Sequence, residues 1–145
     1  MKIVIASDHG GYSYKEEIKK WLSDLHYIVL DAGTNSEASC DYPDFAIKAG
    51  EMVAHGEADF GIVICRTGEG ISIAANKVKG VRCGVGYHPT VARLMREHND
   101  ANMISFGADF FSLEQIKEMI SIFLSTNFLG EKHLRRVNKI TQYEK

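Results

Sequence analysis

The sequence predicts an α/β fold, a three-layer sandwich with a doubly wound, five-stranded parallel sheet. Five short apolar runs rich in β-branched residues have the character of buried strands, and segments of helical periodicity lie between them. Alternating strands and helices form right-handed crossovers, which place helices on both faces of a parallel sheet. The 145 residues, 45% hydrophobic and 25% charged, suffice for one core. We therefore expect residues 1–145 to form a single domain.

The first half of the chain contains three predicted strands and two predicted helices. Residues 2–6 (KIVIA), 27–30 (YIVL) and 60–65 (FGIVIC) are runs typical of strands buried on both faces. Between the first two, apolar residues recur with helical spacing at Tyr14, Ile18, Trp21, Leu22 and Leu25, while Lys15, Glu16, Lys19 and Lys20 take the other face. The pattern over residues 43–55 predicts a second helix, which leads into the third strand.

The second half repeats the alternation. A helix over residues 71–78 is predicted to follow the third strand. Residues 81–85 (VRCGV) and 102–106 (NMISF) complete the five strands, and a helical pattern over residues 89–98 separates them. The helix that follows the fifth strand has Ser112 as its predicted N-cap, and its apolar residues are Leu113, Ile116, Met119, Ile120, Phe123 and Leu124.

Residues 130–145 form a predicted helical tail of different character. The tail is mostly charged, and its apolar residues are limited to Leu134, Val137, Ile140 and Tyr143 at roughly helical spacing. So narrow an apolar stripe suits packing against another subunit, although a helix on the surface of its own subunit would show the same pattern.

Composition excludes several classes of partner. The formal net charge is −2, with acidic and basic residues interspersed, so nothing in the chain resembles the basic patch of a nucleic-acid-binding protein. The start, MKIVIASDHG, has too few apolar residues for a signal peptide or a membrane span, so we expect a cytoplasmic protein. Cys40, Cys65 and Cys83 are odd in number and lack zinc-type spacing, which predicts free thiols and no structural metal.

Two loops are predicted to form the functional site. In a doubly wound sheet, ligands bind outside the carboxyl ends of the strands, where the strand order reverses. The first strand is followed by SDHGG (residues 7–11) and the third by CRTGEG (residues 65–70), so both loops open on the same edge. Asp8 and His9 are titratable groups at the tip of the first strand, although an aspartate there could instead form a turn and cap the next helix.

Cys65 stands at the mouth of a glycine-rich turn. A free cysteine that ends a buried strand can be a simple core residue. However, Gly68 and Gly70 allow backbone N–H groups to face a bound anion, a helix start near Ile71 adds more, and Arg66 would favour the thiolate. A tyrosine-phosphatase-like cysteine would need an arginine at position 71, which is isoleucine. A proton-transfer enzyme instead needs a base beside a carbonyl and N–H donors for the enediolate oxygen, and this stretch supplies both.

Five motifs carry a resemblance to a known family. They are SDHGG at 7–11, DYP at 41–43, C-x-T-G-x-G-I-S-I-A-A-N-K at 65–77, REHNDAN at 96–102 and H-x-x-R-V at 133–137. In this order, over nearly the whole chain, they resemble ribose-5-phosphate isomerase B and the wider family that includes the galactose-6-phosphate isomerase subunits. The resemblance implies a Rossmann-like homodimer, or a dimer of dimers, with active sites between subunits and the tail packed on the partner.

The resemblance also implies an activity. Ribose 5-phosphate and ribulose 5-phosphate would interconvert through a cis-enediolate, without a metal ion or an organic cofactor. The alternatives are an isomerase of another aldose such as allose 6-phosphate, and a non-catalytic family member that binds a sugar phosphate.

By the same resemblance, matching positions acquire expected roles. Cys65 would be the base that moves a proton between C1 and C2, and Thr67 would assist proton movement between the substrate oxygens. The N–H groups from Gly68 through Glu69 to Gly70 would stabilise the enediolate. His98 of the partner subunit would open the furanose ring. The expected substrate-binding residues are Asp8 and Tyr42 on the ring hydroxyls, Asn99 beside His98, and His9, Lys132 and Arg136 at the phosphate.

Four positions depart from the family pattern. Arg66 replaces a glycine, and Glu69 replaces an apolar residue. Arg66 could pair with Glu69 or point into the site, and Glu69 could compete with Cys65 as the base, although we favour Cys65. Lys132 and Asp109 each replace an arginine. A lysine keeps the charge and loses the bidentate fork, whereas an aspartate facing the site would repel phosphate.

Overall fold

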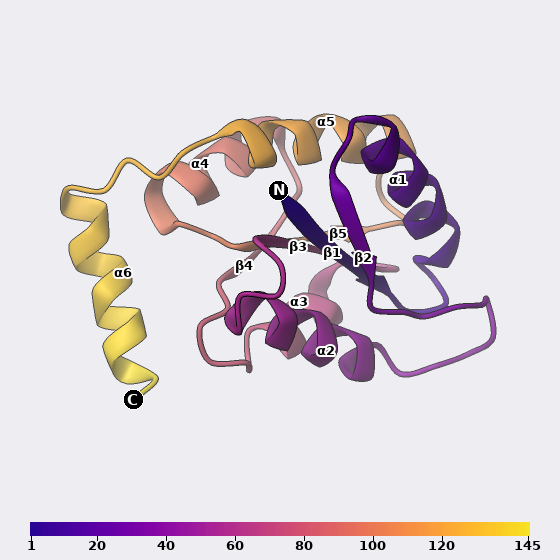
Figure 1. Ribbon diagram of the computed structural model, residues 1–145, viewed down its shortest axis with the longest axis horizontal. Helices are drawn as coiled ribbons and strands as arrows, with labels where there is room; N and C mark the ends of the chain where they lie inside the picture. Colours follow the sequence, from indigo (N-terminus) through magenta and orange to yellow (C-terminus); the bar gives the residue numbers. More distant parts are fainter.

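The computed structural model describes residues 1–145 as a central parallel sheet covered by helices on both faces (Figure 1). The strands are β1 (Lys2–Ser7), β2 (Ile28–Asp31), β3 (Phe60–Cys65), β4 (Cys83–Val85) and β5 (Met103–Gly107). The helices are α1 (Tyr12–Asp24), α2 (Tyr42–Ala54), α3 (Glu69–Ala75), α4 (Pro89–Asn99), α5 (Leu113–Ser125) and α6 (Lys132–Tyr143). The predicted α/β class and five-stranded sheet are confirmed.

The order of the strands decides where a ligand can bind. The sheet has the order β2-β1-β3-β5-β4, with every neighbouring pair parallel. The chain first moves outward from β1 to β2 and then returns to place β3 on the other side of β1. Because the order reverses between β1 and β3, the loops that follow these two strands lie side by side at the carboxyl edge of the sheet. We call this edge, where β3 ends, the Cys65 edge.

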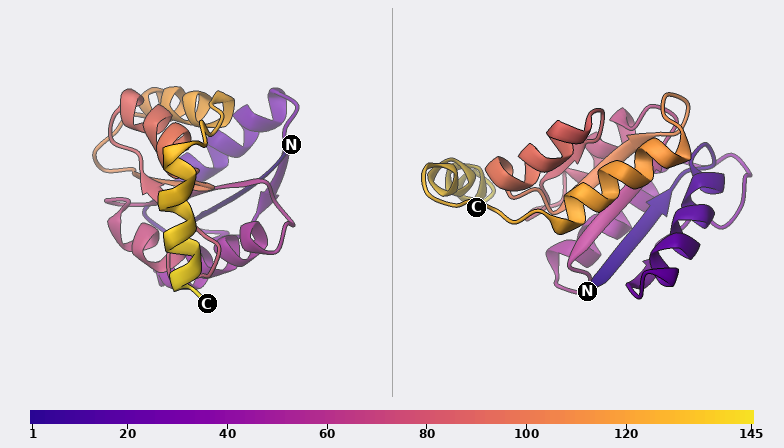
Figure 2. Two further views of the ribbon diagram at one scale, coloured as in Figure 1. Left: turned by 90° about the vertical axis from the view of Figure 1, so that its left-hand side faces the viewer. Right: turned by 90° about the horizontal axis from the view of Figure 1, so that it is seen from above.

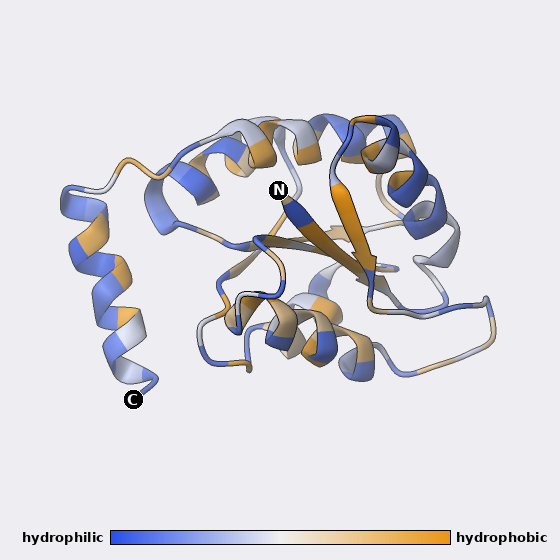
Figure 3. Cartoon of the chain, in the orientation of Figure 1, coloured by the Kyte–Doolittle hydropathy of each residue, from blue (hydrophilic) through white to orange (hydrophobic).

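Two apolar layers hold the sandwich together. Successive residues of each inner strand point to opposite faces, so Ile3 and Ile5 pack under α1, α4 and α5, while Val4 and Ala6 pack over α2 and α3. Both sets are fully buried, which is why these strands have no polar alternation in the sequence. Figure 3 shows the result, with apolar strands inside and hydrophilic outer helix faces.

Element boundaries differ most from expectation around α3. This helix begins at Glu69 and ends at Ala75, whereas residues 71–78 were predicted. It starts early because Gly68 adopts a left-handed conformation (φ +81°) that turns the chain directly into the helix. It ends early because the side chain of the next residue, Asn76, exchanges hydrogen bonds with the backbone N–H (2.8 Å) and C=O (2.9 Å) of Cys83.

Lys15 corrects the predicted face of α1. The sequence pattern places it among the solvent-facing lysines, but its side chain is fully buried. Its Nζ lies 2.7 Å from Asp31 at the end of β2 and 2.9 Å from Glu16. A partner far away in sequence therefore draws this lysine into the interior.

The C-terminal tail stands apart from the sandwich. Figures 1 and 2 show α6 beyond the β4 edge, joined by the segment that follows α5, and it packs mainly against α4. Val137 is its one buried residue, while Leu134, Ile140 and Tyr143 remain exposed. The predicted helix in this tail is confirmed. None of the helices combines the length and the apolar character that a membrane crossing requires.

Candidate active site

The β1 loop, residues 8–11, holds Asp8 in a fixed turn. Its carboxylate Oδ1 accepts the N–H groups of Gly10 (2.9 Å) and Gly11 (3.2 Å), and the side chain is largely buried. The alternative role of Asp8 as a turn-forming residue is therefore real. The same hydrogen bonds hold the carboxylate at the Cys65 edge, so the turn does not exclude a role in binding.

His9 and Tyr42 come to this edge from two sides. The Nδ1 atom of His9 accepts the backbone N–H of Cys40 at 3.3 Å, so in the neutral ring the proton sits on Nε2, which is left as a donor. Tyr42 begins α2, and its ring lies so close to Gly70 that a Cβ at that glycine would be 2.7 Å from Tyr42 Cζ. The structure therefore brings both predicted residues to the loops that follow β1 and β3.

Cys65 is buried at the end of β3, with its sulfur directed at the β3 loop, residues 66–68. The N–H of Gly68 donates to Cys65 Sγ at 3.1 Å, which places the sulfur as an acceptor. Thr67 Oγ1 accepts the N–H of Glu69 at 3.1 Å, and the N–H groups of Gly70 and Ile71 follow in the first turn of α3, where no preceding carbonyl of the helix can accept them. A thiol, a hydroxyl and backbone donors thus meet in one small region.

Gly68 is required by the geometry of this loop. Besides its positive φ, a Cβ at this position would lie 2.8 Å from the carbonyl carbon of Phe106 and 3.0 Å from the nitrogen of Gly107. The β3 loop therefore passes tightly against the end of β5. Only glycine allows both the turn and this close approach.

Cys83 begins β4, away from the loops that follow β1 and β3. Burial raises the pKa of the Cys83 thiol to about 12, an effect that hydrogen bonds with Ser72 and Ser105 only partly offset. This raised pKa favours the protonated thiol over the thiolate at neutral pH. Cys40, Cys65 and Cys83 are all free thiols.

Arg66 does not pair with Glu69, which corrects one of the two expected arrangements. Its Nη1 instead lies 3.5 Å from Oδ1 of Asp109, beyond β5. Glu69 is exposed in the first turn of α3. Arg66 and Asp109, two of the four residues that depart from the family pattern, thus face one another across the Cys65 edge.

The remaining predicted residues lie elsewhere in the chain. His98 and Asn99 end α4, a helix that returns from the carboxyl ends of the strands and leads into the start of β5. They therefore lie at the amino ends of the strands, on the opposite side of the sheet from Cys65. Lys132 and Arg136 lie on the first turns of α6. One chain by itself therefore contains two separate groups of predicted site residues.

His133 joins the second group, although no role was predicted for it. Its ring stacks on that of His98, with the centroids 4.2 Å apart and the planes 14° from parallel. Desolvation lowers the pKa of His133, and the nearby cationic groups of His98, Lys132 and Arg136 lower it further. The tail motif H-x-x-R-V contains this histidine, so the motif was a signal that could have identified it.

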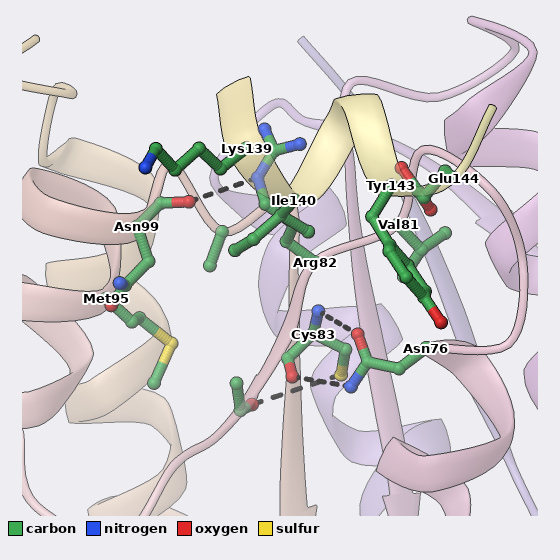
Figure 4. A pocket seen from close by; sticks show the side chains of 12 residues that line it. Asn76, Val81, Arg82, Cys83, Met95, Asn99, Lys139, Ile140, Tyr143 and Glu144 are labelled. Carbon is green, nitrogen blue, oxygen red and sulfur yellow. Dashed lines mark hydrogen bonds between the residues drawn. The ribbon is translucent and has the colours of Figure 1, made fainter. Parts of the chain in front are cut away.

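A pocket of about 720 Å³ lies between α6 and the β4 edge, away from Cys65 (Figure 4). Apolar side chains of α6, Ile140 and Tyr143, face Val81 and Met95 of the sandwich. Arg82 Nε donates to the backbone carbonyl of Asn99 at 3.0 Å beside it. No group of three or more histidine, cysteine, aspartate or glutamate side chains is arranged to bind a metal ion.

The Ribose/Galactose Isomerase family model matches residues 3–140 of the chain. Ribose-5-phosphate isomerase B of Escherichia coli (strain K12) is 43% identical, and the alignment covers 99% of this chain and 96% of that protein. The solved structure of Clostridium thermocellum ribose-5-phosphate isomerase B is 49% identical with a TM-score of 0.98, covering 99% of this chain and 97% of the other. The enzyme of Mycoplasma genitalium with bound ribulose-5-phosphate is 39% identical with a TM-score of 0.95, covering 99% and 95%.

Proposed function

Because this chain belongs to the Ribose/Galactose Isomerase family, we propose that it interconverts ribose 5-phosphate and ribulose 5-phosphate, with Cys65 as the base. Relatives named ribose-5-phosphate isomerase B, which this chain matches over nearly their whole length, support an aldose-ketose isomerase. The structure of one of them has ribulose-5-phosphate bound. The observation that carries the proposal is the buried Cys65 sulfur, placed at 3.1 Å from the N–H of Gly68 beside the first turn of α3.

The proposed chemistry moves one proton between neighbouring carbons. The Cys65 thiolate removes the proton from C2 of the open-chain aldose, which leaves a cis-enediolate, and the resulting thiol returns a proton to C1 to give the ketose. Thr67 assists the proton movement between O1 and O2. Backbone N–H groups from Gly68 to Gly70 stabilise the negative oxygen as the charge develops; those of Gly68 and Glu69 also donate to Cys65 Sγ and Thr67 Oγ1.

Cys65 is better placed for this role than Glu69. The sulfur is held at the end of a strand by a backbone hydrogen bond, and its surroundings exclude water. The Glu69 carboxylate is exposed, has no ion-pair partner and sits on a short helix. A base that transfers a proton between two carbons of one substrate needs a fixed position, which favours the cysteine.

We further infer that the complete site needs two copies of the chain. Cys65, Asp8, His9 and Tyr42 lie at one edge of the sheet, whereas His98, Asn99, Lys132 and Arg136 lie at the other edge and on α6. In a two-fold homodimer the second group of one copy can meet the first group of the other, which produces two equivalent sites. His98 of the partner subunit would then open the sugar ring, and the tail would pack on the partner.

The surface of α6 supports this assembly. Leu134, Ile140 and Tyr143 are 47%, 52% and 93% exposed, and the pocket beside them is lined by further apolar side chains. Apolar surface of this extent on a single helix is stabilised when a second protein covers it. Residues 1–145 thus act as one domain whose tail, 130–145, completes the neighbour's surface.

The direct test is turnover by the purified protein with ribose 5-phosphate, and with allose 6-phosphate as a second substrate. We expect wild type and Glu69→Gln to convert ribose 5-phosphate, and Cys65→Ala to be inactive. Activity lost mainly in Glu69→Gln would move the base to that glutamate. Conversion of allose 6-phosphate but not of ribose 5-phosphate would replace the proposed substrate by allose 6-phosphate. Binding of either sugar phosphate without turnover would indicate a non-catalytic binding protein.

A mixing experiment tests the shared site. Cys65→Ala and His98→Asn homodimers should each be nearly inactive on ribose 5-phosphate. If their subunits exchange, half of the dimers become mixed and each mixed dimer has one intact site, so activity should return to about one quarter of wild type. No recovery, in mixed dimers verified by mass, would contradict a site built from two subunits.

A further inference from the structure

The Cys65 edge is poor in cations. Its polar groups come from the five loops that follow the strands and from the first residue of α3. These segments contribute the acidic residues Asp8, Glu37, Asp41, Glu69 and Asp109. Arg66 is the only lysine or arginine among them. The nearby Lys15 and Lys19 are committed to ion pairs with Glu16 and Asp31. A doubly charged phosphate monoester that enters at this edge therefore meets one cation that these segments supply, Arg66.

The backbone at Arg66 is held firmly. The C=O of Cys65 accepts the N–H of Ala108 at 2.9 Å, and the C=O of Arg66 accepts the N–H of Asp109 at 3.0 Å. The two loops thus continue the pairing of β3 with β5 beyond the ends of these strands. This pairing fixes the direction in which the Arg66 side chain leaves the backbone.

The stem of Arg66 crosses the β1 loop. A Cβ on Gly10 would be 2.5 Å from Arg66 Cγ and 3.3 Å from Nε, so the side chain occupies the space that the missing Gly10 side chain leaves. The same Cβ position is 3.3 Å from Asp8 Oδ1. The long side chain therefore lies over the loop that contains Asp8 and His9, and its guanidinium reaches Asp109.

The partner of the guanidinium is easily exchanged. Arg66 and Asp109 make a single contact of 3.5 Å, and their side chains are 59% and 47% exposed. An exposed ion pair of this kind is weak, whereas a guanidinium and a phosphate can form two parallel charge-assisted hydrogen bonds. We propose that Arg66 binds the phosphate group of the substrate and exchanges Asp109 for it. This inference rests on the proposed function, because it assigns the phosphate contact that this chain contributes to that site.

The assignment separates two parts of the substrate. The reacting carbons lie at Cys65 and the backbone donors, while the phosphate lies where Arg66 reaches over the β1 loop. Arg66 then selects phosphorylated sugars over free sugars. Asp109 keeps the guanidinium in place while the site is empty.

A double-mutant cycle tests the proposal by calorimetric titration of the full-length protein with ribose 5-phosphate and with inorganic phosphate. The variants are Arg66→Gln, Asp109→Asn and the pair together. Arg93→Gln is the matched control, because Arg93 is also exposed and paired, 2.8 Å from Glu97. We expect Arg66→Gln to weaken both dissociation constants about tenfold, the double variant to stay equally weak, and the control to match wild type.

Two results would overturn the proposal. If the double variant regains the wild-type affinity, Arg66 acts only by neutralising Asp109. If Arg66→Gln binds both ligands like wild type, the phosphate lies elsewhere. Turnover distinguishes this inference from the proposed function: a wild-type protein that binds ribose 5-phosphate through Arg66 yet converts none of it would refute the isomerase and leave the phosphate contact standing.

Discussion

Loss of Asp31 should destabilise the protein more than loss of its buried partner Lys15. The Lys15 ammonium has no solvent exposure and relies on Asp31 (2.7 Å) and Glu16 (2.9 Å). Asp31 has a second cation, because Lys19 Nζ lies 2.7 Å from the same carboxylate oxygen, and its Oδ1 accepts the N–H of Gly33 at 2.8 Å. The two partners are therefore not equally replaceable.

The expected magnitudes follow from this asymmetry. Removal of one partner of a buried ion pair costs about 3–5 kcal/mol when the other charge is left uncompensated. In Asp31→Ala the buried ammonium keeps Glu16, so we expect about 2–3 kcal/mol, a large part of the 5–15 kcal/mol typical of a folded domain. In Lys15→Met the apolar stem is replaced and Asp31 keeps Lys19, so about 1 kcal/mol or less is expected.

Urea denaturation of wild type, Asp31→Ala and Lys15→Met at one protein concentration measures the difference. Lys19→Met is the control, since this partly exposed lysine should contribute under about 1 kcal/mol. The midpoints should fall in the order wild type, Lys15→Met, Asp31→Ala, with unchanged slopes. A Lys15→Met variant less stable than Asp31→Ala would refute the reasoning, because the buried charge itself would then be a net stabilising feature.

Three further predictions concern acid stability, the β3 loop and the tail. The pKa values of Glu16 and Asp31 lie below their ordinary ranges, mainly through hydrogen bonds from Lys15 and Lys19 that outweigh the cost of burial. The resulting stabilisation is present above the ordinary carboxylate pKa and is lost as the pH falls through the lowered pKa values. The melting temperature of wild type should therefore drop in acid more steeply than that of Asp31→Asn. Gly68→Ala should abolish most turnover and lower the free energy of unfolding in urea by about 1–3 kcal/mol, because φ is +81° and the Cβ would meet the backbone of β5. The control Gly56→Ala, at φ +80° with no neighbour within 4 Å, should keep full activity. Equal losses of turnover in both variants would exclude the close approach to β5 as the cause. Ile140→Asp should shift the protein toward monomers in sedimentation and lower turnover in parallel, and a dimer of undiminished stability would show that α6 is not in the interface.

Much of the fold was predictable because it depends on local patterns. Strands buried on both faces appear as short apolar runs, and four of the five runs coincide with observed strands to within one residue at either end. The helix at Leu113–Ser125 was predictable from its spacing and from Ser112, which forms a capping box with Gln115 in the structure. The run at 81–85 was too long, because Arg82 donates its N–H to the Asn102 side chain and pairing with β5 begins at Cys83.

The first half of the candidate site was also predictable. The topological rule for parallel sheets places the ends of β1 and β3 together, and the structure brings Asp8, His9, Tyr42 and Cys65 to that edge. Charge partners were not predictable in this way. Arg66 has an acidic residue three positions away, yet it contacts Asp109, because the ends of β3 and β5 run side by side.

The sequence by itself determined the class of fold, the alternation of elements and the loop that carries Cys65, because hydrophobic period, caps and glycines act over a few residues. Only the tertiary structure decided the strand order, the burial of Lys15, the contact between Arg66 and Asp109, and the separation of His98 from Cys65. These features depend on segments distant in the chain, and their energies arise from packing and from charge pairs that no local pattern records. The two halves of the candidate site lie at opposite edges of the sheet for this reason, since a helix that returns from one edge must end at the other.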